Sequence, residues 1–371
     1  MASKKKSKVK KDEIPKIKDH KVKELADLLS EVEGKVLVID HPYGDPDSIA
    51  SKYGLRYILT KQFNLEVDIA YSHEVSHFQN KTLTKLLDSH YGFQPLPVEN
   101  VSLHDYEIIF CVDFNLSNTN IPFENDEIYE GASHKFMVID HHKKTKRDVE
   151  VEPIFEDIIE SGICSTSTRI IEYFEALGIK LKSDNEEQKL LATALCFGVE
   201  NDALSGGKKQ RDRQALAYIG EAISSDLEKR LTEISRSPQS QDAIGEGMKN
   251  RRKVGNIYCI GSAGIIIEDN KNAIAELSDQ LVMEAGIEVS IAYGVINDKI
   301  EMSFRALHSS SISAAKVAQL FGGGGRTDAA GATVDLGPFK DYPPNDEESK
   351  SLLMKAIEDL LIIPKLKSIT G

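Results

Sequence analysis

The sequence predicts an α/β fold, with an N-terminal parallel sheet followed by a smaller C-terminal domain of mixed α/β structure. Short runs rich in Val and Ile alternate with longer segments of helical spacing. These runs are apolar along their whole length, as in a sheet that is buried on both faces. The chain has 371 residues and 40% of them are hydrophobic, which is enough for two cores.

The first part of the chain supplies the parallel sheet. After a helical segment at 21–33, strands are expected at 35–40, 66–71, 106–113 and 135–140. Helices are expected between and after them, at 48–63, 77–90, 165–177, 185–197 and 211–234. Strands that alternate with helices in this way form a parallel sheet, because each helix carries the chain back to the starting edge.

The second part of the chain begins where the apolar residues no longer recur at a regular spacing. Between residues 235 and 253, Ser, Pro, Gly and Gln accumulate, which predicts a linker. Beyond it we expect strands at 257–267, 288–296 and 300–304, helices at 273–283 and 347–361, and a hairpin turn at 297–299. The expected domains are therefore a disordered Lys-rich tail (1–20), a first domain (21–234), the linker (235–253) and a second domain with a C-terminal helix (254–371).

Charge is distributed unevenly along the chain. The formal net charge is -13, yet residues 1–11 hold six lysines and no acid, which leaves 40 of the 46 basic residues against all 59 acidic ones. A body this acidic repels a long nucleic acid duplex, so extended groove binding is disfavoured, whereas small anionic substrates remain compatible with a local basic pocket. The tail is typical of a solvated leader, with a loose nucleic-acid contact as the alternative.

No apolar run approaches the roughly 18 residues that a membrane span needs, and no signal-peptide segment follows the lysines. The four cysteines stand singly in apolar surroundings, which favours reduced core thiols over disulfides or a paired-cysteine zinc site. We therefore expect a soluble, cytoplasmic protein that is not secreted and does not contact a membrane.

Carboxylates and imidazoles follow the expected strands at the point where each strand ends. They are His41, Asp45, Asp47, Asp113, Asp140, His141 and His142, and Asp202 follows a buried helix. The carboxyl ends of parallel strands meet at one edge of the sheet, where ligands bind in open α/β folds. Gathering so many acids there costs several kcal/mol unless a cation lies among them.

Carboxylate and imidazole donors without thiolates suit ions such as Mn²⁺ or Mg²⁺. The donors are too many for one tetrahedral ion, whereas two ions about 3.5–4 Å apart that share a carboxylate would use them and would promote in-line displacement at phosphorus. The sequence therefore predicts phosphoester hydrolysis.

A glycine run in the second domain predicts a binding loop. Gly322, Gly323, Gly324 and Gly325 precede Arg326, so the backbone can approach an anion closely while the arginine offers a bidentate fork to phosphate.

These motifs, in this order, resemble the DHH phosphoesterase family, and the glycine run resembles the signature of the DHH-associated domain of RecJ-type exonucleases and nano-RNases. The resemblance covers residues 35 to 335, approximately. It implies that one metal ion is held by His41, Asp45 and Asp113. It implies that a second ion is held by Asp47, Asp113, His141 and Asp202.

The resemblance also assigns further roles. Asp113 would bridge the two ions, His142 would face the substrate as a catalytic residue, and Asp140 would orient the imidazoles. Arg305 matches a family arginine that contacts substrate phosphate, as the glycine run does, whereas Arg326 stands where the family usually has His. In the stretch at 161–168, a Ser or Thr is expected to be the N-cap of a helix. The resemblance adds that this helix start lies near the metals, with a phosphate contact as the alternative.

The function implied is that of a bilobed phosphoesterase with two divalent ions, Mn²⁺ first and Mg²⁺ or Co²⁺ as alternatives, and a cleft between its domains. The expected reaction is hydrolysis of short oligoribonucleotides or dinucleotides to mononucleotides. Alternatives are a 3′,5′-bisphosphate nucleotide phosphatase, a RecJ-like single-strand exonuclease, an inorganic pyrophosphatase or polyphosphatase and, from another class, a non-catalytic nucleotide-binding sensor or scaffold. Binding of single-stranded nucleic acid and formation of a homodimer are left open.

Overall fold

The computed structural model describes residues 18–42, 44–71, 78–91, 95–117, 122, 135–144, 152–233, 236–307, 309–341 and 346–370. Most of the Lys-rich tail expected at 1–20 lies outside these ranges. The chain divides into two compact units, Met1–Ile234 and Ser235–Gly371. Within the described ranges, no helix is both long enough and apolar enough to cross a bilayer.

Unit 1 is built on a six-stranded sheet in which every pair of neighbouring strands is parallel. The strands are β1 (Val36–Asp40), β2 (Val67–Tyr71), β3 (Leu96–Pro97), β4 (Ile108–Val112), β5 (Lys135–Asp140) and β6 (Phe155–Ile158), in the order β3-β2-β1-β4-β5-β6. Every residue of β1 and β4 is buried, so the predicted parallel α/β sheet is confirmed. The short edge strands β3 and β6 were not expected.

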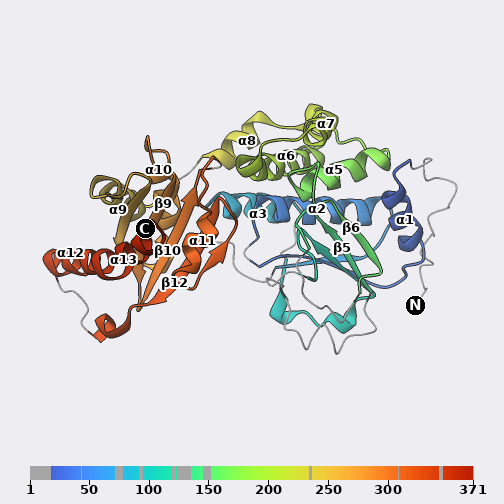
Figure 1. Ribbon diagram of the computed structural model, residues 1–371. Helices are drawn as coiled ribbons and strands as arrows, with labels where there is room; N and C mark the ends of the chain where they lie inside the picture. Colours follow the sequence, from blue (N-terminus) through green and yellow to red (C-terminus); the bar gives the residue numbers. More distant parts are fainter. Residues whose placement is uncertain are drawn as a thin grey trace. The chain divides into compact units, whose positions relative to one another are not determined.

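Helices cover one face of this sheet (Figure 1). They are α1 (His20–Leu29), α2 (Pro46–Lys61), α3 (Phe78–Tyr91), α5 (Thr166–Ala176), α6 (Glu186–Gly206), α7 (Gln210–Ile219) and α8 (Ser225–Thr232). Helix α2 packs on β1 and β2 and also on α5 and α6, so it lies between the sheet and a second helical layer. The other face packs against 3₁₀ turns at Val98–Asn100 and Leu103–Asp105.

Two helices of unit 1 differ from the expectation. Helix α6 continues to Gly206, so Asp202 lies inside this helix and not in a loop after it. The single helix expected over 211–234 is divided into α7 and α8 by a 3₁₀ turn at Gly220–Ala222, and the Ser224 side chain caps the new helix by accepting a hydrogen bond from Leu227 N.

Unit 2 contains a second six-stranded sheet, in which β8 and β9 are parallel and the other pairs are antiparallel. Its strands are β7 (Arg252–Val254), β8 (Tyr258–Ile265), β9 (Val289–Ile296), β10 (Lys299–Ala306), β11 (Gly324–Gly325) and β12 (Ala329–Asp335), in the order β11-β12-β10-β9-β8-β7. The expected hairpin joins β9 and β10, and Asn297 in its turn has a φ of 54°, which Asn tolerates better than most residues.

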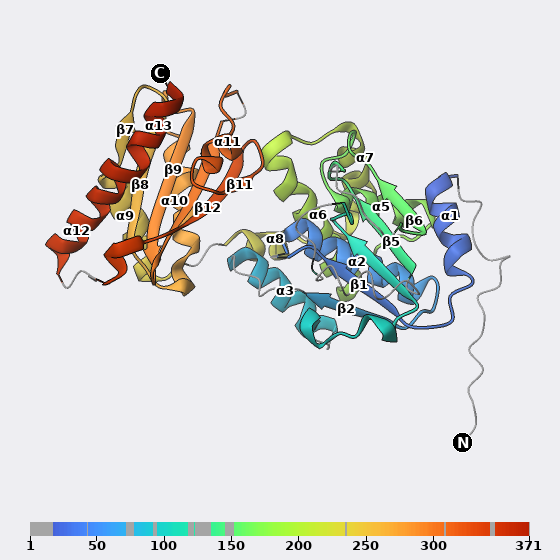
Figure 2. The same cartoon turned by 60° about the horizontal axis from the view of Figure 1, so that its bottom comes forward.

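Helices lie on both faces of the second sheet. Helices α9 (Pro238–Lys249) and α10 (Asn272–Val282) share one core with it, and α11 (Ala314–Gln319), α12 (Glu347–Ala356), a π-helical turn (Ile357–Ile362) and α13 (Ile363–Thr370) share the other. The C-terminal helix is longer than expected and contains the π turn. Figure 2 shows α12 and α13 running one after the other beside the strands.

The segment 235–253, expected as a linker, is mostly ordered secondary structure. It contains α9 and β7 because Ser237 caps the helix, Pro238 occupies its first turn and Ile244 is buried. Gly247 lies against α10 so closely that a Cβ would stand 2.4 Å from a methyl carbon of Leu277. Among the small residues interpreted as a linker, Ser237 therefore caps a helix and Gly247 allows close helix packing.

Candidate metal centre

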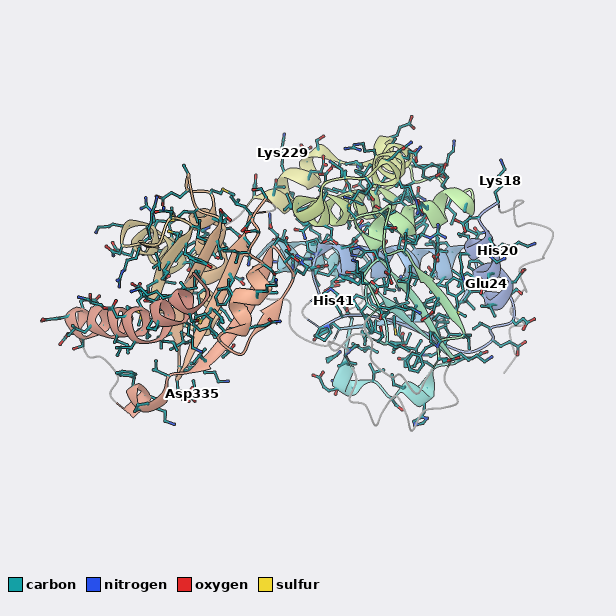
Figure 3. All side chains as sticks on the ribbon, viewed as in Figure 1. Lys18, His20, Glu24, His41, Lys229 and Asp335 are labelled. Carbon is teal, nitrogen blue, oxygen red and sulfur yellow. The ribbon has the colours of Figure 1, made fainter. Side chains whose placement is uncertain are left out.

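The predicted ligands gather at the carboxyl edge of the first sheet. The strand order changes direction between β1 and β4, which is where open α/β sheets bind ligands. His41 directly follows β1, Asp113 directly follows β4 and Asp140 ends β5. Figure 3 labels His41 among the side chains of unit 1.

Asp113 has an unusual backbone conformation. Its φ of 64° is in the left-handed region, which non-glycine residues rarely adopt and which Asp tolerates better than most. Its N–H donates to Ile139 O at 2.9 Å, and its side chain is 1% exposed. Backbone strain of this kind persists where the surrounding structure holds it, and it concentrates at functional sites.

Three groups of side chains at this edge could each hold a metal ion, and Asp113 belongs to two of them. Within each group, the donor atoms lie within 4.8 Å of one another. The groups are His41, Asp45 and Asp113; Asp47, His141 and Asp202; and Asp113, His141 and His142. The first two correspond to the expected ligand sets, apart from Asp113 in the second set. Asp113 Oδ2 lies 3.5 Å from His41 Nε2, and Asp113 Oδ1 lies 3.5 Å from His141 Nε2, so one carboxylate faces both groups. The assignment of these residues as ligands stays a prediction.

The start of α2 places two of the acids. Asp45 caps the helix by accepting from Ser48 N at 2.9 Å, and Asp47 follows in the first turn with its side chain fully buried. Nδ1 of His41 lies 2.8 Å from Pro42 O. That contact leaves Nε2 of the His41 ring next to the carboxylates.

The start of α5 holds the acids from a third direction. Thr166 N and Ser167 N each donate to a carboxylate oxygen of Asp47 at 2.7 Å. The Thr166 hydroxyl donates to Asp113 Oδ1, also at 2.7 Å. The N-cap expected at this helix start is Ser165, whose hydroxyl accepts from Thr168 N at 3.1 Å. The phosphate contact that the resemblance left open is not what the structure shows, because the donors of Thr166 and Ser167 hold protein carboxylates. The run of Ser and Thr was a visible signal for this helix start, although it did not identify the partner.

Helix α6 can approach these residues because it carries a glycine. A Cβ on Gly198 would lie 2.5 Å from Ser167 Oγ and 3.1 Å from Asp47 Cα. A side chain at this position would displace the Ser167 hydroxyl and crowd the backbone at the start of α2. Since Asp202 lies four residues further along α6, the glycine also sets the position of that acid.

Asp140 organises the residues that follow β5. Its Oδ1 accepts from the backbone N–H groups of His141 (2.8 Å) and His142 (3.1 Å) and lies 2.8 Å from His142 Nδ1. Its Oδ2 accepts from Asn115 Nδ2 at 2.7 Å. Asp140 was expected to orient both imidazoles; its side-chain contact is to the ring of His142, whereas the ring of His141 faces Asp202 at 3.2 Å. Asn115 was missed by sequence reasoning.

The acids shift the protonation of the imidazoles. Burial alone would lower the pKa of His141, but the close contact with Asp202 at 3.2 Å and the charge of Asp113 raise it to about 9. The pKa of His41 is raised well above its usual value, because contacts with Asp113 and Asp45 outweigh burial. Burial would raise the pKa of Asp113, but its imidazole neighbours, led by His41, hold it well below its usual range.

Other acids of the cluster are destabilised as anions. Burial, followed by the charges of Asp113 and Asp202, raises the pKa of Asp47 well above its usual range. Burial also raises the pKa of Asp202 despite its contact with His141. Within the described part of the chain, the buried atoms Asp113 Oδ2 and His141 Nε2 make no hydrogen bond of good geometry. A crowded, thiolate-free set of oxygen and imidazole donors fits divalent cations, which would relieve this repulsion.

The basic residues predicted in unit 2 meet at one end of its sheet. Arg305 lies opposite Ala329 on β12, and the carbonyl of Ala329 accepts a hydrogen bond from Arg326 N at 2.7 Å. The Arg305 guanidinium donates to Asp279 Oδ1 (2.6 Å) and Ser303 Oγ (3.1 Å). The side chain of Arg326 is 58% exposed.

The glycine run has a structural reason that the sequence did not reveal. Gly324 and Gly325 form β11, and a Cβ on Gly323 would stand 2.1 Å from Gly331 O. Gly322 and Gly325 have φ values of 77° and 148°. Close packing on β12 and positive φ therefore explain three of the four glycines, whereas Gly324 is exposed and a Cβ there would meet no atom within 4 Å among the described residues.

Comparison with known families agrees with the two units. Residues 35–199 match the N-terminal domain of the DHH family, and residues 263–361 match the DHHA1 domain. A relative from Methanocaldococcus jannaschii, described as an uncharacterized protein, is 26% identical over 333 residues. That alignment covers 89% of this chain but 63% of the relative, so the chain spans less than two thirds of that protein.

Two solved structures align with this chain over most of its length. An exopolyphosphatase-related protein from Bacteroides fragilis aligns with a TM-score of 0.66 at 16% identity, over 93% of this chain and 97% of that one. RecJ from Thermus thermophilus in complex with Mg²⁺ aligns with a TM-score of 0.41 at 13% identity, over 91% of this chain and 52% of RecJ. The first similarity shows a common fold.

Proposed function

Because this chain belongs to the DHH/DHHA1 phosphoesterase family, we propose that it uses two divalent cations to hydrolyse phosphodiester bonds of short oligoribonucleotides or dinucleotides, releasing mononucleotides. The observation that carries the proposal is the position of Asp113, whose two carboxylate oxygens face His41 on one side and His141 on the other. A carboxylate in this position suits a bridge between two ions, Mn²⁺ being our first choice.

A pair of such ions, when bound, supplies a hydroxide near neutral pH and neutralises charge on the phosphoryl oxygens. The chain itself prepares the site. Thr166 fixes the orientation of Asp113, and Asp140 holds Nδ1 of His142. With Nδ1 engaged, Nε2 is the ring atom of His142 that would exchange a proton with the substrate or leaving group.

Short substrates suit the charge of this protein. The net charge is -13, so long polyanions are repelled by the whole body, whereas a short one needs few cationic contacts. Arg305 and Arg326 gather at one end of the second sheet and would supply them. A guanidinium offers two parallel donors to a phosphate, which is a charge-assisted contact.

The test is hydrolysis of a panel of substrates by the purified protein with Mn²⁺ or Mg²⁺. The panel contains a dinucleotide, RNAs of 3–5 and of about 25 nucleotides, a 3′,5′-bisphosphate nucleotide, pyrophosphate and tripolyphosphate. The proposal expects the highest kcat/KM for the shortest diesters and loss of turnover in Asp113→Asn. Asparagine tolerates the left-handed backbone as Asp does, so this control removes charge without adding strain.

Each other outcome contradicts the proposal in a recognisable way. A preference for the longest RNA indicates a single-strand exonuclease, and phosphate release from the bisphosphate nucleotide indicates a phosphatase. Fastest cleavage of pyrophosphate or tripolyphosphate indicates an inorganic substrate. Tight nucleotide binding without turnover indicates a sensor or scaffold.

A further inference from the structure

Asn115 occupies a fully enclosed position two residues after the central acid of the cluster. The residue is 1% exposed, and its side-chain Nδ2 donates to Asp140 Oδ2 at 2.7 Å. Its Oδ1 accepts from Ser117 N at 3.2 Å and from the Ser117 hydroxyl. The orientation of the amide is set by these neighbours, because the N–H of Ser117 requires an acceptor and the carboxylate of Asp140 requires a donor.

The two carboxylate oxygens of Asp140 have different hydrogen-bond partners. Oδ1 has two backbone donors and the ring of His142, whereas Oδ2 receives Asn115. The Asp140 side chain is completely buried, so Oδ2 cannot exchange a lost donor for bulk water. Without Asn115, the carboxylate would turn to satisfy Oδ2, and the alignment of Oδ1 with His142 Nδ1 would be lost.

We propose that Asn115 is a positioning residue that acts on His142 through Asp140. The chain of contacts runs from Asn115 Nδ2 to Asp140 Oδ2, and from Asp140 Oδ1 to His142 Nδ1. It fixes the ring so that Nδ1 carries the proton and Nε2 remains for the substrate. This inference deepens the proposed function and rests on it for the role of His142. Hydrogen-bond partners that orient the side chains around a metal site typically contribute about ten- to hundredfold to its activity or metal affinity.

A merely structural role makes a different prediction. Asn115 also holds Ser117, so its removal could act on the loop after β4 and on Asp113 rather than on His142. A double-mutant cycle distinguishes the two roles. If Asn115 acts through His142, its substitution should change kcat little in a protein that already lacks the His142 ring.

The experiment compares Asn115→Leu, which is close in size and cannot donate, in the wild-type and His142→Ala backgrounds. Each protein is assayed for kcat and KM on the best diester, and bound Mn²⁺ is counted by calorimetry. In the wild-type background, kcat should fall about 10–100-fold with KM within about twofold and with metal binding retained. In the His142→Ala background, the same change should alter kcat by less than about twofold.

A second readout is independent of turnover. In protein labelled with ¹⁵N in its histidine rings, NMR should show the His142 tautomer protonated on Nδ1, and Asn115→Leu should broaden or shift that signal. Asn270→Leu is the matched control, because Asn270 is also buried and binds two serine hydroxyls, in unit 2. It should change neither kcat nor the His142 signal.

Equal losses of kcat in both backgrounds, loss of bound Mn²⁺, or an unchanged ring signal would overturn the positioning role. Should the protein hydrolyse none of the phosphoesters, the proposed function fails while the ring signal still decides whether Asn115 orients His142.

Discussion

The hydroxyl of Thr166 donates a 2.7 Å hydrogen bond to Oδ1 of Asp113, joining the first turn of α5 to the carboxylate at the middle of the donor cluster. The two residues are 53 positions apart in the sequence and both are buried. Because Asp113 faces two groups of donors, its orientation decides whether both groups can act together.

Thr166→Val should weaken binding of divalent ions. Valine keeps the shape of threonine and loses the donor, so Asp113 is free to turn, and hydrogen bonds to metal-ligating groups typically contribute about 10–100-fold to affinity. Calorimetric titration of the metal-free protein with Mn²⁺ measures this loss. Thr166→Ser keeps the hydroxyl and should retain most of the affinity. Equal affinities for wild type and the valine variant would contradict the role given to Thr166.

Removal of metal should make the stability of unit 1 depend on pH. The pKa of His141 is about 9 in the folded protein without metal, and about 6.5 in an unfolded chain. Its contribution is therefore full below pH 6.5, approximately, and is lost as the pH rises through about 9. The raised pKa values of Asp47 and Asp202 act in the same direction.

Urea unfolding in EDTA at a series of pH values measures this slope. We expect the free energy of unfolding to fall between pH 6.5 and 9, approximately. The slope should flatten in His141→Gln and persist in the control His90→Gln. Saturating Mn²⁺ should oppose the fall, because its ligands bind better when deprotonated. Stability that rises over this range in EDTA would contradict the account.

A buried ion pair between the end of β1 and helix α2 should be important for folding. Lys52 Nζ lies 2.7 Å from Asp40 Oδ2, both side chains are under 5% exposed, and Lys52 also donates to Ala70 O. Lys52→Met leaves Asp40 buried without its partner and should cost about 3–5 kcal/mol of unfolding free energy.

The double variant Lys52→Met/Asp40→Asn should recover part of that cost, since no uncompensated charge remains. The exposed pair Lys144–Glu156 provides the control, and Lys144→Met should cost at most about 1 kcal/mol. Urea denaturation of the four proteins measures these differences. If Lys52→Met cost no more than Lys144→Met, the pair would have no special structural role.

Arg326→Ala should impair hydrolysis of a dinucleotide more than hydrolysis of a small chromogenic phosphodiester. Its side chain is exposed, and a charge-assisted contact with phosphate contributes roughly 1.5–3 kcal/mol, so kcat/KM for a dinucleotide should fall about 10–100-fold. A small chromogenic phosphodiester should be cleaved nearly as well as by wild type. Arg251→Ala, which removes an arginine from the other side of unit 2 beside β7, should affect neither substrate. Equal losses on both substrates would mean that Arg326 supports the fold or the metal centre.

Much of the fold could be predicted from local pattern. The strands at β1, β4 and β5 were found because buried parallel strands are continuous apolar runs, and their acids were found because they follow those runs directly in the chain. The segment 235–253 was wrongly predicted as a linker. Gly247 is explained by close packing on helix α10, and Ser237 is explained by its role as the cap of α9; the local hydrophobic pattern shows neither contact.

The sequence by itself determined the kind of chemistry, because the order of residues along the chain places His41, Asp113 and Asp140 at the ends of parallel strands. The tertiary structure decided which groups complete that edge. The backbone donors of Thr166 and Ser167 meet Asp47 across about 120 residues, and the amide of Asn115 meets Asp140. Every helix start offers the same backbone N–H groups, so the local sequence does not indicate which acceptor they bind. The hydrogen-bond partner of an asparagine side chain is likewise not indicated by the residues next to it. The contacts of Asp47 exist only once α2 and α5 have packed together, and the contact of Asn115 with Asp140 exists only once β4 and β5 have paired. Such packing and pairing depend on the whole chain.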